Sequence, residues 1–254
     1  MKLFFRKVGQ GDPLIILHGL FGSSDNWHTL SKTFAETHTV YVIDQRNHGQ
    51  SPHSDDFNYR LLTEDLFEFM QQESLEKVNL IGHSMGGKAA MNFAVKYPQR
   101  VSKLMIVDIV PKQYKMRYDN ILSGMKALQP QTLTSRKEAE EKLLPYVPDP
   151  AERQFILKNL DRSPEGGFRW KVNLKSLDAH MDELGIAMEF TGTFDGPTLF
   201  LTGTGSNYFM PGDDVAVRRY FPRATFKTLD TGHWVQAEKP EEFAAVALEF
   251  FGSR

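Results

Sequence analysis

The feature that most constrains this chain is a glycine-rich turn between an apolar run and a helical pattern. The apolar run is Val78 to Ile81, the turn reads Gly82-His83-Ser84-Met85-Gly86, and helical spacing follows from Lys88 to Tyr97. A strand that turns directly into a helix needs small residues at the bend, because bulky neighbours would clash there. The motif therefore predicts a strand, a tight turn and a helix, with Ser84 under backbone strain at the turn.

Short apolar runs alternate with helical patterns over most of the chain, which is typical of a mainly parallel α/β sheet. Strands are expected at Leu3 to Phe5, Leu14 to Leu17, Thr39 to Ile43, Val78 to Ile81, Val101 to Val110, Thr198 to Leu201 and Thr225 to Leu229. Helices are expected at Thr63 to Gln72, Lys88 to Tyr97 and Pro240 to Phe251. The sequence thus predicts an α/β fold with a mostly parallel central sheet flanked by helices.

Residues 111–190 break this alternation, because they are rich in charge, contain several helical patterns and show no convincing strand. Leu122, Met125 and Leu128, for example, have helical spacing. An insertion between two core strands would lie over the carboxyl ends of the strands, where open α/β sheets bind ligands. We therefore expect residues 1–110 and 191–254 to form the core and residues 111–190 to form a helical cap, or lid.

The composition argues against several kinds of partner and site. The formal net charge is −2, so no electrostatic feature favours nucleic acid. The chain has no cysteine, which excludes disulfides and cysteine-ligated metals and suits a reducing compartment. The start of the chain lacks the long apolar region of a signal peptide, and no segment is long enough to cross a bilayer. We expect a cytoplasmic protein with no nucleic-acid partner and no membrane span.

In its strand-to-helix context, the Gly-x-Ser-x-Gly pattern is typical of a nucleophile elbow, which makes Ser84 the candidate nucleophile. The following helix directs the positive end of its dipole towards a developing oxyanion. A second loop, His18-Gly19-Leu20-Phe21-Gly22, follows another apolar run and could supply a further backbone donor. We assign the oxyanion hole to the N–H groups of Leu20 and Met85, with Phe21 as the alternative to Leu20.

A general base for this serine is expected late in the chain, between the last strand and the last helix. Of the eight histidines, His233 alone combines that position with the required chain order. The acid that would orient its imidazole has two candidate positions. Asp108 ends an apolar run, whereas Asp213 and Asp214 come later and resemble residues that start a helix. We favour Asp108 and keep the pair Asp213/Asp214 as the alternative.

Other residues are weaker candidates. The candidate substrate-binding residues are Phe21, His83, Trp170 and Trp234. In the cap, Phe155, Phe168 and Trp170 could line a pocket, although such aromatic side chains are at least as often plain packing. His180-x-x-Glu183 could place two metal ligands on one helix face, but no further ligand cluster accompanies it. We expect no metal and no organic cofactor.

The segment from residue 112 to residue 137 is basic, with Asp119 as its only acid. Its cations are Lys112, Lys115, Arg117, Lys126, Arg136 and Lys137. They could guide an anionic substrate, such as an acyl-coenzyme A, to the cleft. Charge of this kind more often belongs to a solvated helix face.

Five blocks of the sequence resemble the α/β-hydrolase superfamily and, within it, the YbfF-like bacterial esterases. They are HGLFGS at 18–23 with DNW at 25–27, DQRNHGQS at 44–51, GHSMGGK at 82–88, LMIVDIVP at 104–111 and FRWKVNL at 168–174. The resemblance covers nearly the whole chain, although Asn47 stands where the wider superfamily usually has glycine.

The resemblance implies an α/β-hydrolase fold with a cap inserted after the sixth core strand, and serine carboxylesterase or thioesterase activity on small acyl esters or thioesters. It also implies a triad acid after that strand, which corresponds to Asp108 and agrees with the lack of a carboxylate at residues 203–208. Lipases, C–C bond hydrolases, perhydrolases and non-catalytic ligand receptors share the fold and remain alternatives. Dehalogenases and epoxide hydrolases are disfavoured, because they use aspartate where Ser84 stands.

Overall fold

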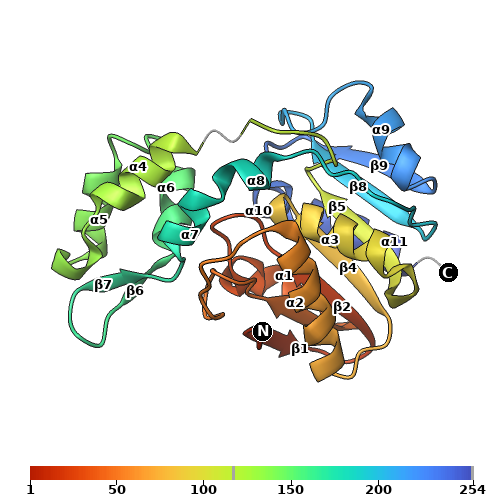
Figure 1. Ribbon diagram of the computed structural model, residues 1–254, viewed down its shortest axis with the longest axis horizontal. Helices are drawn as coiled ribbons and strands as arrows, with labels where there is room; N and C mark the ends of the chain where they lie inside the picture. Colours follow the sequence, from red (N-terminus) through yellow and green to blue (C-terminus); the bar gives the residue numbers. More distant parts are fainter. Residues whose placement is uncertain (116–117, 253–254) are drawn as a thin grey trace.

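The central sheet of the molecule has seven strands in the order β1-β3-β2-β4-β5-β8-β9. The computed structural model describes residues 1–115 and 118–252 (Figure 1). The strands are β1 (Phe5–Val8), β2 (Asp12–Leu17), β3 (His38–Ile43), β4 (Val78–His83), β5 (Val101–Val107), β8 (Thr198–Gly203) and β9 (Ala224–Leu229). Neighbouring strands pair in parallel, except that β1 runs antiparallel to β3. The predicted fold class is confirmed.

Side chains of the central strands alternate between two apolar layers, one on each face of the sheet. In β2, Leu14 and Ile16 belong to one layer, whereas Ile15 and Leu17 belong to the other. Each fully buried side chain of this kind contributes about 1.5–3 kcal/mol to folding. Because both faces are buried, these strands consist of continuous apolar runs, which is why they stand out in the sequence.

Helices cover both layers and hold the sheet between them. The helices of the core are α1 (His28–Phe34) and α11 (Pro240–Gly252) against one layer, and α2 (Tyr59–Gln72) and α3 (Met85–Lys96) against the other. Two further helices, α9 (Asp213–Tyr220) and α10 (Val235–Glu238), lie on either side of β9 in the sequence. Asn58 begins α2 with a side-chain oxygen that accepts the N–H of Leu61, which satisfies one free amide of the first turn.

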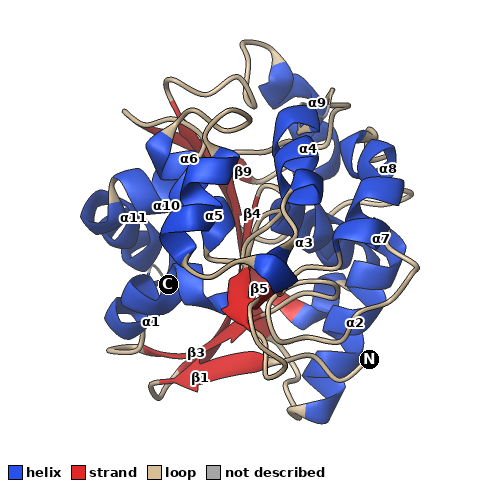
Figure 2. Cartoon of the chain, turned by 90° about the vertical axis from the view of Figure 1, so that its left-hand side faces the viewer, coloured by secondary structure: helices blue, strands red, loops and turns tan. Residues whose placement is uncertain are grey.

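Between β5 and β8 the chain leaves the sheet and forms a separate group of helices, drawn in green and teal from the left to the centre of Figure 1 and facing the viewer in Figure 2. These helices are α4 (Asp119–Ala127), α5 (Arg136–Leu143), α6 (Pro150–Leu157), α7 (Leu174–Ala179) and α8 (Met181–Gly185). The strand that the resemblance numbers sixth is β5, the fifth in chain order among the described residues. The inserted helices therefore follow the strand that the resemblance indicates, although this strand is numbered β5 here.

The insertion also contains a hairpin that the sequence analysis did not expect. Strand β6 (Leu160–Arg162) pairs antiparallel with β7 (Phe168–Trp170). The expectation that residues 111–190 contain no strand is therefore wrong. Each strand has only three residues and carries charged side chains, so no apolar alternation identifies it. The signal in the sequence is the pair Gly166-Gly167 in the turn. Both residues adopt positive φ, at 98° and 66°, a conformation that glycine accepts most readily.

Several element boundaries also differ from the sequence-based expectations. The edge strand runs over Phe5–Val8 rather than Leu3 to Phe5, because Phe5 pairs with Ile43 and Val8 with Val40. Strand β5 ends at Val107, so Asp108 lies in the loop that follows it. None of the described helices is both long enough and apolar enough to span a bilayer.

Candidate active site

Three side chains meet at the carboxyl edge of the sheet, each on a loop that follows a strand. Ser84 follows β4, Asp108 follows β5 and His233 follows β9. Nε2 of His233 lies 3.0 Å from Oγ of Ser84, and its Nδ1 lies 2.7 Å from Oδ2 of Asp108. Since β4 and β5 are neighbours, their loops open side by side at the edge where α/β sheets bind ligands.

The backbone at Ser84 is strained, with φ 51° and ψ −118°. The flanking glycines explain how the chain accepts this turn. A Cβ on Gly82 would lie 2.4 Å from the carbonyl oxygen of Gly86, and a Cβ on Gly86 would lie 2.5 Å from those of Leu17 and His18. These contacts with backbone atoms cannot relax cheaply, so β4, the turn and α3 close together only with glycine at both positions. The strained conformation directs Oγ of Ser84 towards the imidazole.

Asp108 is fully buried and is held by more than the histidine. Its Oδ1 accepts the N–H of Gly203 at 3.0 Å, and its Oδ2 accepts hydrogen bonds from the Ser206 hydroxyl and from His233. Ser206 has no signal in the sequence, because a hydroxyl in the loop after β8 does not stand out as a carboxylate would. The additional bonds fix the carboxylate in one orientation towards the imidazole.

Asp213 and Asp214 do not take this place. Asp213 is the first residue of α9, where its Oδ2 accepts the N–H of Met210 at 2.8 Å and pairs with the Lys112 ammonium. Asp214 is the second residue of the same helix. Both positions are typical of acids that start a helix, as the sequence suggested. The carboxylate in contact with His233 is that of Asp108.

Aromatic rings hold the imidazole of His233 in place. The Tyr208 ring stacks on it, with centroids 4.0 Å apart and planes inclined by 18°. His83 donates from Nε2 to the backbone oxygen of His233 at 3.0 Å, so its ring anchors the histidine loop. Trp234 turns towards the cap, where its ring lies 5.7 Å from that of Phe155. Tyr208 gave no signal in the sequence, because only the fold brings its loop to this ring.

Two backbone N–H groups near Ser84 are available for an oxyanion. Within the described part of the chain, the amides of Leu20 and Met85 donate no hydrogen bond. The amide of Phe21, the alternative to Leu20, already donates to Nε2 of His48 at 3.2 Å. Met85 is the first residue of α3, where amides lack partners inside the helix and the dipole is positive.

Three histidines of this region are buried and neutral. Burial lowers the pKa of His18 to about 4 and those of His48 and His83 to about 3. Neighbouring imidazoles add to the effect at His48 and His83. Each of the three rings also hydrogen-bonds to a backbone carbonyl, which fixes it in place.

We expect these three histidines to destabilise the folded protein in mild acid. Below pH 6.5 the unfolded chain takes up protons at these imidazoles, whereas the folded chain does so only near pH 3 to 4. Stability is therefore lost as the pH falls through 6.5, by about 1–2 kcal/mol per histidine between pH 7 and pH 5. Urea unfolding curves at the two pH values measure the difference, and equal unfolding free energies would contradict the prediction.

The hollow beside Ser84 is narrow and lies between the loops of the sheet and the inserted helices α4 and α6. Its lining includes three candidate substrate-binding residues, Phe21, His83 and Trp234, and also Phe155, which the sequence suggested as a pocket residue. Its free volume is about 20 Å³, room for one or two water molecules, so side chains must move apart to admit a substrate. Ser84 also lines a second narrow hollow, together with Met85 and Lys88 of α3.

Trp170 lies elsewhere. It lines a separate surface hollow with His53, Arg169 and Lys171, and neither hollow beside Ser84 includes it. The structure thus places Trp170 outside both hollows beside Ser84, and its contact with substrate stays a prediction. Trp170 lies in β7 of a hairpin that the sequence did not predict, so the sequence could not show which hollow it lines. Phe168 is buried in the same strand and does not line the pocket either.

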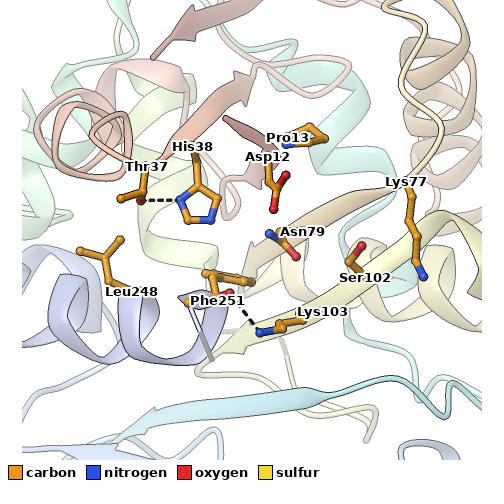
Figure 3. Close-up of a pocket in the computed structure, with 11 residues that line it drawn as sticks. Asp12, Pro13, Thr37, His38, Lys77, Asn79, Ser102, Lys103, Leu248 and Phe251 are labelled. Carbon is orange, nitrogen blue, oxygen red and sulfur yellow. Dashed lines mark hydrogen bonds between the residues drawn. The ribbon is translucent and has the colours of Figure 1, made fainter. Parts of the chain in front are cut away.

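Another hollow, of about 610 Å³, opens at the amino edge of the sheet (Figure 3). His38, Asn79 and Lys103 are among its polar lining residues, and Nζ of Lys103 donates to the backbone oxygens of Phe250 and Phe251 at 3.0 Å. None of the predicted site residues belongs to this hollow. It lies at the edge of the sheet opposite the loops that carry the candidate triad.

Most cations of the basic segment are engaged by the cap or by its neighbours. Lys112, Lys126 and Lys137 pair with carboxylates, and Arg136 donates to two backbone oxygens. Arg117 lies outside the described residues. These contacts favour a solvated surface held by ion pairs and hydrogen bonds over a surface that attracts an anionic substrate. In the described ranges, no three His, Asp or Glu side chains form a potential metal site, His180 and Glu183 included.

Comparison with known proteins gives one consistent result. Residues 12–240 match the model of the alpha/beta hydrolase fold family. The chain is 38% identical over 253 residues to the sn-1-specific diacylglycerol lipase ABHD11 of Danio rerio, across 95% of this chain and 80% of that protein. It is 32% identical over 233 residues to esterase YbfF of Escherichia coli, across 90% and 89%. A solved marine microorganism esterase superposes with a TM-score of 0.96 at 41% identity, across 98% and 99%.

Proposed function

Because this chain belongs to the alpha/beta hydrolase fold family and is a carboxylic ester hydrolase, we propose that it cleaves acyl esters and thioesters through Ser84, His233 and Asp108. The observation that carries the proposal is the continuous contact from Oγ of Ser84 through the imidazole to the Asp108 carboxylate, at 3.0 and 2.7 Å. Both distances are within hydrogen-bond reach, as proton transfer to a general base requires.

In the acylation step, Oγ of Ser84 attacks the acyl carbon while Nε2 of His233 takes the hydroxyl proton. Asp108 accepts a hydrogen bond from Nδ1 of the ring, which fixes the tautomer and stabilises the imidazolium. The N–H groups of Leu20 and Met85 bind the oxyanion, a role left open to Leu20 because the Phe21 amide is engaged by His48. The tetrahedral intermediate collapses as His233 returns the proton to the leaving alcohol or thiol.

Deacylation repeats the same proton transfers with water. His233 removes a proton from water as its oxygen attacks the acyl carbon, and Ser84 leaves as the alcohol with that proton. The acid is released and the enzyme returns to its starting state, so the cycle needs no redox partner and no cofactor.

We assign substrate contacts in this reaction to Phe21, His83 and Trp234, with Phe155 from the cap. Residues 111–190 act as the cap in this proposal, and residues 1–110 and 191–254 act as the hydrolase core. The hollow beside Ser84 is enclosed by Phe21, Phe155 and Trp234, and we propose that its opening admits small acyl groups more readily than long-chain lipids. The proposed substrates therefore differ from diacylglycerol, the substrate in the name of the relative from Danio rerio.

Labelling with a fluorophosphonate probe, together with turnover of p-nitrophenyl esters from acetate upward, tests the proposal. We expect one covalent label, located at Ser84 by peptide mass spectrometry, and hydrolysis that is fastest for short acyl chains. Labelling without ester turnover, accompanied by turnover of a dienone, would instead assign the site to C–C bond hydrolysis. Neither labelling nor turnover would identify a ligand receptor.

A further inference from the structure

Lys88 lies in α3 one helical turn after Ser84, and its amide donates to the Ser84 carbonyl oxygen at 3.1 Å. The side chains of Ser84 and Lys88 both line the second narrow hollow, between α3 and the cap. Tyr59, Tyr114 and Tyr208 line the same hollow. The proposed mechanism gives this lysine no task.

The side chain of Lys88 is only 1% exposed. Its Nζ donates to the backbone oxygens of Leu184, at 3.4 Å, and of Ile186. The rings of Tyr59 and Tyr114 lie 5.6 and 5.0 Å from the same nitrogen. An ammonium has three N–H donors, so one of them remains for another acceptor.

No carboxylate among the described residues forms an ion pair with this ammonium, and burial is the one cause of its pKa shift. Burial lowers that pKa to about 8, which leaves Lys88 largely charged at neutral pH. The tyrosines cannot act as counter-ions, because burial raises the pKa values of Tyr59, Tyr114 and Tyr208. The hollow therefore carries an uncompensated positive charge.

The other buried cations of the core and cap show how this chain ordinarily treats such a charge. Arg46 donates to both carboxylate oxygens of Asp65, at 2.5 and 2.8 Å. Arg153 pairs with Glu140 at 3.5 Å. A buried charge without a partner is expensive, because it has lost its hydration and gained no opposite charge. Lys88 is thus in the state expected of a residue whose counter-ion arrives with the ligand.

We propose that Lys88 binds a carboxylate at the far end of the acyl chain, so that the preferred substrates are esters or thioesters of short dicarboxylic acids. The inference rests on the function proposed above, since it assigns a substrate class to the site of Ser84. The ester carbonyl lies at Ser84, the methylene groups pass the tyrosine rings, and the terminal carboxylate accepts the free N–H of Lys88.

The position of Lys88 limits the length of such a chain. Ser84 immediately precedes α3, Lys88 lies in its first turn, and both line the same narrow hollow, so the two ends of the acyl group lie close together. The proposal places about two to four methylene groups between them, as suits neighbours about one helical turn apart. The narrowness of the hollow also favours a slender, short chain. Leu184 of α8 contributes to its wall, so movement of the cap can widen it.

A purely structural role for Lys88 is the competing explanation. Its bonds to Leu184 and Ile186 tie the end of α8 to α3, and a cation is favourable at a helix C-terminus. A tether of this kind would affect all substrates alike. A carboxylate-binding role affects only substrates that carry the terminal charge, so the ratio of two rates separates the explanations.

The test compares methyl hydrogen glutarate with methyl 5-methylhexanoate, in which an uncharged branch of similar shape replaces the carboxylate. Hydrolysis is followed by acid release in a pH-stat at pH 7.0 for the wild type, Lys88→Met and Lys96→Met. Lys96 is an exposed lysine of the same helix and serves as the matched control. We expect the wild type to prefer the glutarate ester in kcat/KM by about tenfold or more, and Lys88→Met to lower that preference about ten- to a hundredfold. Lys96→Met should keep the wild-type ratio.

Each outcome decides between the explanations. A wild type without preference for the charged ester would overturn the role of Lys88, while ester hydrolysis itself would still support the proposed function. An equal loss on both esters in Lys88→Met would identify the tether. Hydrolysis of neither ester by the wild type would overturn the proposed function and this inference with it. If thermal unfolding shows that Lys88→Met does not fold, Lys88→Gln takes its place. The ratio of kcat/KM for the two esters is then compared between Lys88→Gln and the wild type.

Discussion

Replacement of Ser84 by alanine is expected to lower kcat for p-nitrophenyl ester hydrolysis by about 10⁵- to 10⁶-fold, the loss typical of removing a serine nucleophile. Without Oγ no acyl-enzyme forms, and the imidazole of His233 loses the hydroxyl that lies 3.0 Å from it. What remains comes from substrate binding and from the oxyanion donors, which the substitution does not touch. Steady-state rates, with active protein counted after purification to exclude trace wild type, measure the effect.

Ser102→Ala is the matched control, because Ser102 lies in β5 and lines the hollow at the opposite edge of the sheet. We expect its rate to stay within about twofold of the wild type, as for most substitutions away from a site. Equal rates for wild type and Ser84→Ala would remove Ser84 as the nucleophile and with it the acyl-enzyme mechanism.

Asp108→Asn is expected to lower kcat by about 10³- to 10⁴-fold, although it preserves the shape of the side chain. The amide can place its NH₂ group against Nδ1 of His233, which favours the tautomer whose Nε2 carries the proton and cannot accept another. It also leaves the imidazolium without a neighbouring negative charge. Because Asp108 is fully buried and bonded to Gly203 and Ser206, water cannot replace the lost charge.

Asp213→Asn and Asp214→Asn complete the comparison, since these aspartates were the alternative acids in the sequence. Asp213 contacts Met210 and Lys112 rather than His233, so we expect rates within a few-fold of the wild type. A large loss in Asp213→Asn combined with a small loss in Asp108→Asn would reverse the assignment. Circular dichroism of each variant separates a catalytic loss from a failure to fold.

Much of the fold was predictable because its signals are local. The run Leu14 to Leu17 is apolar throughout since both sides of β2 are buried, and Gly82 and Gly86 mark a turn that side chains would obstruct. Ser84 and His233 could be nominated from the sequence because each lies next to the end of a strand. Asp108 could be favoured over Asp213 because it ends an apolar run, whereas Asp213 resembles a residue that starts a helix, and the family resemblance agreed with that choice.

The remainder depends on contacts between distant segments. Ser206 donates a hydrogen bond to Asp108, which lies 98 residues earlier in the sequence, and Tyr208 stacks on His233. Asp108 and His233 are themselves 125 residues apart, and no local pattern marks such partners. Trp170 lines a separate hollow because it belongs to the pair of β6 and β7, which no apolar alternation in the sequence marks. Lys88 lay within a recognised block but gave no sign of burial, which arises only when α8 packs over α3.

The way the cap joins the sheet has a consequence for how proteins of this design diversify. Strands β5 and β8 are hydrogen-bonded neighbours, with Leu104 opposite Thr198 and Val107 opposite Leu201. The sheet itself therefore holds the two ends of the insertion together, and the insertion acts on the core as one long loop. The entropy of closing a loop grows only with the logarithm of its length, by about 0.6 kcal/mol per doubling. A lineage can lengthen, shorten or replace the stretch between β5 and β8, and so change what reaches Ser84, at almost no cost to the sheet that aligns the reacting groups.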